Sequence, residues 1–214
     1  MNDWNWTLID RVAMVEREHL NETDVCFYYM TRDGRGYMAS DANSLITDFK
    51  HDPVRFANNQ AVMAYKRSAV EQLAGYVSKF FMDRANIFAG STVNLVPMPT
   101  SIPRSDDGRD DRLDDLCKIV ADTTGFVQYK PVIDIVRRVT PAHISGDRSY
   151  EALRRNMHWT SNDDLGGSTV VLLDDVLTTG VHYAVCRDGF RRKYGDGITM
   201  IGLFLALHTW QSSL

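Results

Sequence analysis

The stretch VVLLDDVLTTGVHY, residues 170–183, changes character twice within a few residues. Apolar residues run without a break into two adjacent carboxylates, Asp174 and Asp175. A small, hydroxyl-rich turn then leads to Gly180. An uninterrupted apolar run is typical of a strand that is covered on both faces, as in a parallel sheet. We therefore predict a buried strand over 169–173, with two charges at the point where it ends.

The residues after this strand have the spacing of a helix and then of a second strand. Tyr183, Cys186 and Phe190 recur on one helical face, and Gly195 offers a helix end. The apolar run 198–207 supplies the second buried strand. Because the crossover of a βαβ unit is right-handed, the two strands are expected to lie parallel in one sheet.

The rest of the chain favours an α/β fold. We predict a doubly wound, mostly parallel sheet of about five strands. Residues 1–60 are expected to form a small N-terminal hood or accessory layer, and residues 61–214 the main domain. The expected elements before residue 169 are a helix over 8–20, strands over 25–30 and 36–38, a helix over 61–82, a strand over 92–96 and a helix over 108–122.

Composition excludes several classes of function. The 214 residues carry a formal net charge of −4, so the chain lacks the basic field that drives nucleic-acid binding. Cys26, Cys117 and Cys186 are far apart, which favours neither a disulfide framework nor a zinc ribbon. The longest apolar run is too short to span a bilayer, and the N-terminus is acidic where a signal peptide is basic. We expect a cytoplasmic protein that binds no membrane and does not bind nucleic acid directly.

The residues at the end of the predicted 169–173 strand have the chemistry of a ribose-phosphate site. Ligands of open parallel sheets bind outside the carboxyl ends of the strands. The two carboxylates accept hydrogen bonds, and a vicinal diol such as that of ribose offers two hydroxyl donors. The turn 176–181 exposes N–H groups and the hydroxyls of Thr178 and Thr179 at a helix N-terminus, which attracts phosphate. The simpler alternative is that the carboxylates cap the helix and the glycine only turns the chain.

The segment VVLLDDVLTTG resembles the phosphoribosyl-pyrophosphate (PRPP) motif of type I phosphoribosyltransferases. Two further segments resemble the ComF-like branch of that family: VPMPTSIPRSDDGRDDRLDDL (96–116), its pyrophosphate-loop region, and IDIVRRVTPAHISGDRSYEALRRNMHW (133–159), the part before the PRPP strand. The resemblance covers about residues 61–208. It implies a Mg²⁺-dependent enzyme that transfers the 5-phosphoribosyl group of PRPP to a nitrogen nucleophile, such as a nucleobase, and releases pyrophosphate.

The resemblance also implies which residues form the site. The expected PRPP-binding residues are Asp174, Asp175, Val176, Leu177, Thr178, Thr179, Gly180, Val181 and His182. The expected pyrophosphate loop contains Thr100, Ser101, Arg104 and Arg109. The catalytic candidates are Asp174, Asp175 and Arg154, the last on a lid with Arg148, Arg155 and Asn156. Mg²⁺ is expected to bind through substrate oxygens near the two carboxylates, without a protein-only cage.

Two features leave alternatives open. The loop arginines could instead pair in solvent with neighbouring carboxylates, namely Asp106, Asp107, Asp110 and Asp111. His182 stands where the family usually has Ser or Thr, although an imidazole can also donate to phosphate. These departures motivate a second function: a catalytically silent PRPP- or nucleotide-binding sensor or interaction module, linked to DNA uptake or a nucleic-acid assembly. A homodimer or an assembly partner is compatible with both functions.

Overall fold

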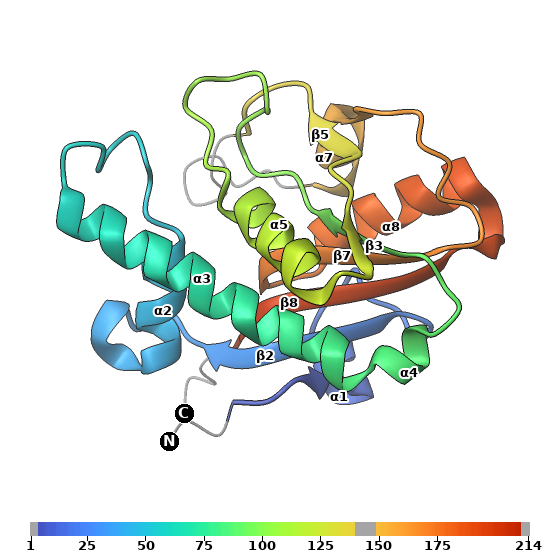
Figure 1. Ribbon diagram of the computed structural model, residues 1–214, viewed down its shortest axis with the longest axis horizontal. Helices are drawn as coiled ribbons and strands as arrows, with labels where there is room; N and C mark the ends of the chain where they lie inside the picture. Colours follow the sequence, from blue (N-terminus) through green and yellow to red (C-terminus); the bar gives the residue numbers. More distant parts are fainter. Residues whose placement is uncertain (1–3, 140–148, 211–214) are drawn as a thin grey trace.

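The computed structural model describes residues 4–139 and 149–210 (Figure 1). Along the chain the elements are β1 (Thr7–Leu8), α1 (Arg11–Val15), β2 (Val25–Arg32), the 3₁₀ turn η1 (Tyr37–Ala39), α2 (Asp41–Phe49), α3 (Gln60–Asp83), α4 (Ala85–Phe88), β3 (Val93–Pro97), α5 (Arg112–Thr124), β4 (Val127–Tyr129), β5 (Ile133–Ile135), α7 (Tyr150–Asn156), β6 (Met157–Trp159), β7 (Thr169–Leu177), α8 (Val181–Tyr194), η2 (Gly195–Gly197) and β8 (Thr199–His208).

The main sheet is mixed but mostly parallel. Its six strands lie in the order β1-β2-β8-β7-β3-β4, and β1 is the antiparallel strand at one edge. β7 and β8 pair in parallel, with Leu173 opposite Leu203, so the predicted βαβ unit is confirmed. The predicted α/β class with a mostly parallel sheet is confirmed as well.

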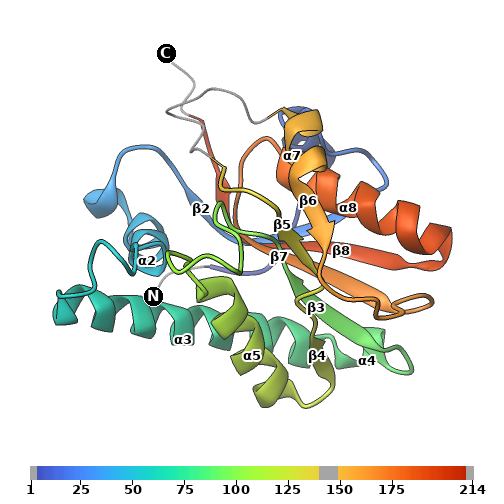
Figure 2. The same ribbon diagram turned by 90° about the horizontal axis from the view of Figure 1, so that it is seen from above.

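Helices cover both faces of this sheet, as Figure 2 shows. Successive residues of a strand point to opposite faces, so β7 contributes to two cores. Val171 packs in the core that α3 and α5 share with one face. Leu172 packs in the other core, with Phe190 of α8. This alternation continues through Asp174 and Asp175, which therefore point to opposite faces of the sheet.

The N-terminal segment contributes β1 and β2 to the main sheet. β2 pairs in parallel with β8, and Ile46 of α2 is buried in the same core as Leu73 of α3. The helix predicted over 8–20 is present but shorter, since only Arg11–Val15 is α-helical. The strand predicted over 36–38 is wrong, because the 3₁₀ turn η1 occupies that region. The domain boundary at residue 60 stays a prediction.

A second, two-stranded sheet is formed by β5 and β6, which pair antiparallel with Ile133 opposite Trp159. α7 precedes β6 and packs against α8. The ring of Trp159 lies 4.8 Å from that of Phe190, so it closes a core. Arg148, an expected lid residue, lies outside the described residues. Within the described part of the chain, none of the helices has the length and apolar character needed to cross a membrane.

Candidate functional site

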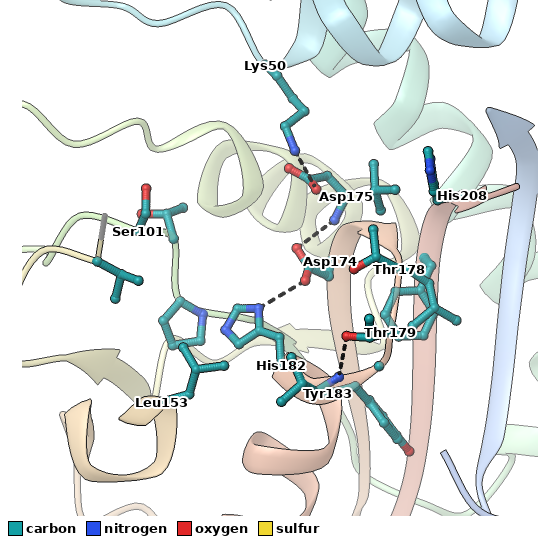
Figure 3. Close-up of a pocket in the computed structure, with 18 of the residues that line it drawn as sticks. Lys50, Ser101, Leu153, Asp174, Asp175, Thr178, Thr179, His182, Tyr183 and His208 are labelled. Carbon is teal, nitrogen blue, oxygen red and sulfur yellow. Dashed lines mark hydrogen bonds and ion pairs between the residues drawn. The ribbon is translucent and has the colours of Figure 1, made fainter. Parts of the chain in front are cut away.

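A cavity of about 1040 Å³ opens at the carboxyl ends of the parallel strands (Figure 3). Arg32 and His208 stand at the ends of β2 and β8, and residues 174–177 form the end of β7. The small sheet and α7 contribute Ile135 and Leu153 to the wall. This is the place where open parallel sheets bind ligands. The volume is sufficient for a nucleotide-sized molecule.

The end of β7 differs from the prediction in one respect. The strand continues to Leu177, so Asp174 and Asp175 lie within it and not after it. Neighbouring strand residues face opposite sides of a sheet, and the two carboxylates therefore meet different helices. Asp174 contacts His182 of α8, whereas Asp175 contacts Arg112 of α5. They are not two equivalent acceptors for one diol.

Asp175 is held by one cation on each oxygen. Arg112 Nη2 donates to Oδ2 at 2.6 Å, and Lys50 Nζ donates to Oδ1 at 3.0 Å. Asp175 is buried, with 6% of the residue exposed. Burial by itself would raise the pKa of Asp175, but Lys50 and Arg112 more than offset this effect and hold that pKa well below its usual range. Asp175 is therefore an ionised, internally paired group.

The ion pairs continue from Asp175 along the cavity wall to α3. Arg112 Nη1 also donates to Asp110, at 2.5 Å, and Lys66 Nζ lies 2.8 Å from the same carboxylate. Lys66 is buried and donates to the carbonyl oxygens of Phe49 and His51 as well. Burial lowers the pKa of Lys66, although Asp110 opposes this shift. A chain of alternating charges thus joins α3, α5 and β7; its members, in order, are Lys66, Asp110, Arg112, Asp175 and Lys50.

Asp174 has a different environment. Its Oδ2 lies 3.1 Å from His182 Nδ1, and its Oδ1 accepts the backbone N–H of Asp175 at 2.8 Å. Its side chain is 16% exposed and borders the cavity. Figure 3 shows Asp174 between His182 on one side and Asp175 with Lys50 on the other. Asp174 is therefore the carboxylate of the pair that lacks a Lys or Arg partner among the contacts of the described residues.

The predicted anion turn is present at residues 178–180, between β7 and α8. Gly180 has φ 81°, a left-handed conformation that favours glycine, and α8 starts directly after it. Val181 N–H points to Thr179 Oγ1 at 3.5 Å. His182 lies in the first turn of α8, as expected. Backbone N–H groups and the helix dipole make this turn a favourable place for phosphate.

The N-terminal segment packs against this turn, which the sequence did not indicate. His19 N–H donates to the carbonyl oxygen of Thr179 at 3.4 Å. A Cβ added at Gly180 would lie 3.0 Å from the side chain of Leu20, so Leu20 would have to shift to admit it. Glu18 and His19 line the cavity. No local pattern around these residues marks them, since their contacts join the two ends of the chain.

The four expected pyrophosphate-loop residues separate into two pairs. Thr100 and Ser101 line the cavity, and Thr100 Oγ1 donates to the carbonyl oxygen of Ile102 at 3.0 Å. Arg104 and Arg109 do not belong to the residues that line it. Both arginines turn instead toward Asp114 of α5.

Asp114 is the centre of a buried polar cluster. It is 2% exposed and accepts from Arg104 Nη1 at 2.6 Å, from Arg109, and from Tyr129 Oη at 2.5 Å. Burial, followed by the contact with Asp114, raises the pKa of Tyr129. Arg109 also pairs with Asp111 at 2.8 Å, one of the partners in the sequence-based alternative. Its side chain is nevertheless 5% exposed, so the alternative in which this arginine pairs in solvent is wrong for Arg109.

The lid candidates have local partners. Arg154 Nη2 donates to Glu151 on the same helix at 2.8 Å, and Arg154 is not among the cavity-lining residues. Asn156 exchanges two hydrogen bonds with the backbone of Arg137, which ties α7 to the chain before it. Leu153 is the α7 side chain that reaches the cavity. These contacts give Arg154 and Asn156 structural partners in this conformation.

A bound Mg²⁺ would need most of its ligands from another molecule. Across residues 4–139 and 149–210, no three His, Cys, Asp or Glu side chains are grouped so that they could hold a metal ion. Lys50 and Arg112 already neutralise Asp175. Asp174 is the remaining carboxylate of the pair, so Mg²⁺ fits here when phosphate and hydroxyl oxygens of a ligand complete its coordination.

Lys50 and Arg112 are the site residues that sequence reasoning missed. They lie 125 and 63 positions from Asp175, so no local motif includes them. Arg112 follows the acidic run and begins α5, which is a weak signal for a partner of some carboxylate. Lys50 caps the C-terminus of α2, a helix that the sequence did not predict.

Comparisons with known proteins give matches among solved structures. No protein-family model matches the chain, and no curated protein sequence does. A hypoxanthine phosphoribosyltransferase from Staphylococcus aureus is similar in its tetragonal crystal form, with a TM-score of 0.39 and 11% identity over 62% of this chain and 62% of that chain. Its orthorhombic crystal form has a TM-score of 0.38 and 10% identity, over 67% of this chain and 76% of that chain. The hypoxanthine phosphoribosyl transferase of Trypanosoma cruzi has a TM-score of 0.38 and 11% identity, over 68% of this chain and 74% of that chain. The chain thus spans less than two thirds of the first of these structures, and the proposal below rests on the geometry of the site.

Proposed function

We propose that the cavity binds PRPP and that the protein transfers its 5-phosphoribosyl group to a nitrogen nucleophile, with release of pyrophosphate. The observation that supports this most strongly is the end of β7. There a carboxylate, Asp174, lies eight positions before His182, and the anion turn 178–180 at the N-terminus of α8 separates them. A hydroxyl-bearing sugar and its phosphate are the groups that such a pair of neighbouring subsites would bind.

In this proposal each part of the wall has a separate task. Backbone N–H groups of the turn and the hydroxyls of Thr178 and Thr179 bind the 5′-phosphate. Asp174 accepts a ribose hydroxyl and stabilises positive charge that develops on the sugar. Thr100 and Ser101 contribute polar groups at the end of β3. Mg²⁺, bound through the phosphates and hydroxyls of the ligand, would neutralise the leaving pyrophosphate.

The nitrogen nucleophile in this proposal is a nucleobase. Ile135, Val139 and Leu153 give the cavity an apolar side near the small sheet and α7. A planar base can bury its faces against such a surface, while a few polar groups fix its orientation. The ComF-like resemblance and the cytoplasmic location stay part of the proposal, as does a homodimer or another assembly.

A second candidate function is PRPP or nucleotide binding without turnover. Its support is that Arg104 and Arg109, the expected pyrophosphate-loop cations, and Arg154, the expected catalytic cation of the lid, have other partners in this structure. A sensor or interaction module needs the anion turn and Asp174 but does not need these arginines. The two candidates therefore differ in chemistry and share the ligand.

Pyrophosphate release separates the two candidates. The purified protein is incubated with PRPP, Mg²⁺ and each base of a purine and pyrimidine panel, and pyrophosphate is measured continuously. Turnover predicts steady production with at least one base, and the Asp174→Asn variant should lack it. PRPP binding without production in any mixture would favour the silent module. Absence of PRPP binding at millimolar concentration would contradict both.

A further inference from the structure

The cavity wall has two sides with respect to the carboxylate pair. The anion turn and His182 lie on the α8 side, next to Asp174. Lys50 lies on the other side, next to Asp175, and Figure 3 shows it opposite His182. A ligand that places one phosphate in the turn and its sugar at Asp174 therefore directs its second anionic end toward Lys50. No cation of the 100–109 loop reaches that region, since Arg104 and Arg109 are held by Asp114.

We propose that Lys50 is the cation that binds the distal, diphosphate end of the ligand, exchanging its contact with Asp175 for a contact with phosphate. This inference rests on the proposed function, and it assigns to α2 a role that the resemblance placed in the loop after β3. It also makes Asp175 an internal counter-ion that holds Lys50 in position before the ligand arrives.

Lys50 and Arg112 both contact Asp175, but they differ in their freedom to leave it. The Lys50 side chain is 40% exposed, and its ammonium group has a single ion pair at 3.0 Å. The Arg112 side chain is 13% exposed, pairs with Asp110 as well as Asp175, and lies over the ring of Phe49. A lysine ammonium is a point charge on a flexible stem, so it can turn toward a new anion at small cost.

Asp175 stays compensated when Lys50 turns away. Arg112 remains at 2.6 Å from its Oδ2, so no bare carboxylate is left in the wall. The other basic residue of the wall, Arg32, ends β2, and β8 separates that strand from β7. Among the described lysine and arginine residues that line the cavity, Lys50 is thus the one that combines proximity to the carboxylate pair with a side chain that is 40% exposed.

The test measures two half-ligands separately. Inorganic pyrophosphate with Mg²⁺ and ribose 5-phosphate are titrated calorimetrically into the wild-type protein and into Lys50→Gln, Lys50→Arg and Lys118→Gln. Lys118 is the matched control, because it is an exposed lysine that pairs with Asp115 on α5 and does not line the cavity. Thermal unfolding of each variant checks that it is folded.

We expect Lys50→Gln to weaken pyrophosphate binding by about 10-fold or more and ribose 5-phosphate binding by less than about 2-fold, because a charged hydrogen bond is lost at one end of the site. Lys50→Arg should restore most of the lost pyrophosphate affinity, and Lys118→Gln should change neither affinity.

Equal weakening of the binding of both probes in folded Lys50→Gln would show that Lys50 acts by holding Asp175, and would overturn the inference. The same conclusion follows if Lys50→Gln behaves like Lys118→Gln, or if the wild type binds ribose 5-phosphate and not pyrophosphate. Binding of neither probe would contradict the proposed function itself.

Discussion

The end of β7 and the loop after β3 both carry charged residues, but the surroundings of these charges differ. At the end of β7, the strand and the helix after it hold Asp174 and the turn at the edge of an open cavity. In the loop, Arg104 and Arg109 bury their charges against Asp114. Main-chain geometry orients the first group toward the cavity, and a buried counter-charge orients the second group toward the protein. Charged residues at a cavity edge therefore bind a ligand or stabilise the fold according to which of these two factors dominates.

The largest expected effect is in the loop. Asp114→Asn should lower the free energy of unfolding by about 3–5 kcal/mol, because it leaves two buried guanidinium groups without their carboxylate. Denaturant unfolding monitored by circular dichroism measures this loss. Asp115→Asn is the control, since Asp115 pairs with Lys118 in solvent and should change stability by less than about 1 kcal/mol. Equal stability of the two variants would show that the charges of the loop after β3 are not held by a buried counter-charge.

At Asp174 we expect the opposite result, a large loss of ligand affinity with little loss of stability. Asp174→Asn should weaken PRPP binding by about 10- to 100-fold, since a charged acceptor for a ribose hydroxyl is lost. Its stability should change little, because the carboxylate is partly exposed and contacts His182 and a backbone N–H. Calorimetric titration and thermal unfolding of the same sample give both values. A large loss of stability with unchanged PRPP affinity would mean that Asp174, like Asp114, stabilises the fold and does not bind the ligand.

Asp175 should behave as a structural residue with a characteristic pH dependence. Its pKa is lower in the folded protein than the ordinary carboxyl value, so its ion pairs contribute stability above about pH 4 and lose it as the pH falls further. Asp175→Asn should cost roughly 1–3 kcal/mol at neutral pH. The unfolding curves of variant and wild type, measured from neutral pH into the acid range, should converge. A constant difference across this range would show that the Asp175 charge is not involved.

The β7–α8 unit could be predicted because its geometry is local. An unbroken apolar strand, a small turn and a helical face follow one another in the sequence, and backbone rules place the turn at the edge of the sheet. The extension of β7 through Asp174 and Asp175 was missed, since charged residues do not look like strand. That error of a few residues hid the fact that the two carboxylates face different helices.

The partners of the charges could not be predicted for a different reason. Lys50 and Arg112 are far from Asp175 in the sequence and meet it only in the folded protein. Their contacts with Asp175 therefore depend on the order of the strands in the sheet and not on spacing along the chain. Asp114 differs from Asp115 only in the helix face on which it lies: one is buried and the other exposed. Within an acidic run, such a difference depends on the packing of α5 against the sheet.

The smallest expected effect concerns His182, which stands next to both Asp174 and the turn. His182→Asn keeps a side chain that can donate to Asp174, and PRPP affinity should fall by no more than about 3-fold. His182→Leu removes the donor and should cost roughly 2- to 10-fold, as expected for one uncharged hydrogen bond. Titration of both variants at one pH and ionic strength measures the difference. Equal affinities would show that the imidazole does not support the ligand-binding position of Asp174.

Amide hydrogen exchange with and without PRPP and Mg²⁺ tests directly whether the β7–α8 turn is the ligand site. Phosphate that accepts from the backbone of the turn should slow the exchange of the amides of residues 178–182. Peptides around Arg104 and Arg109 should exchange at the same rate in both conditions, because Asp114 already holds these side chains. Binding of PRPP that leaves residues 178–182 unprotected, or that protects the 104–109 loop in their place, would contradict the assignment of the site.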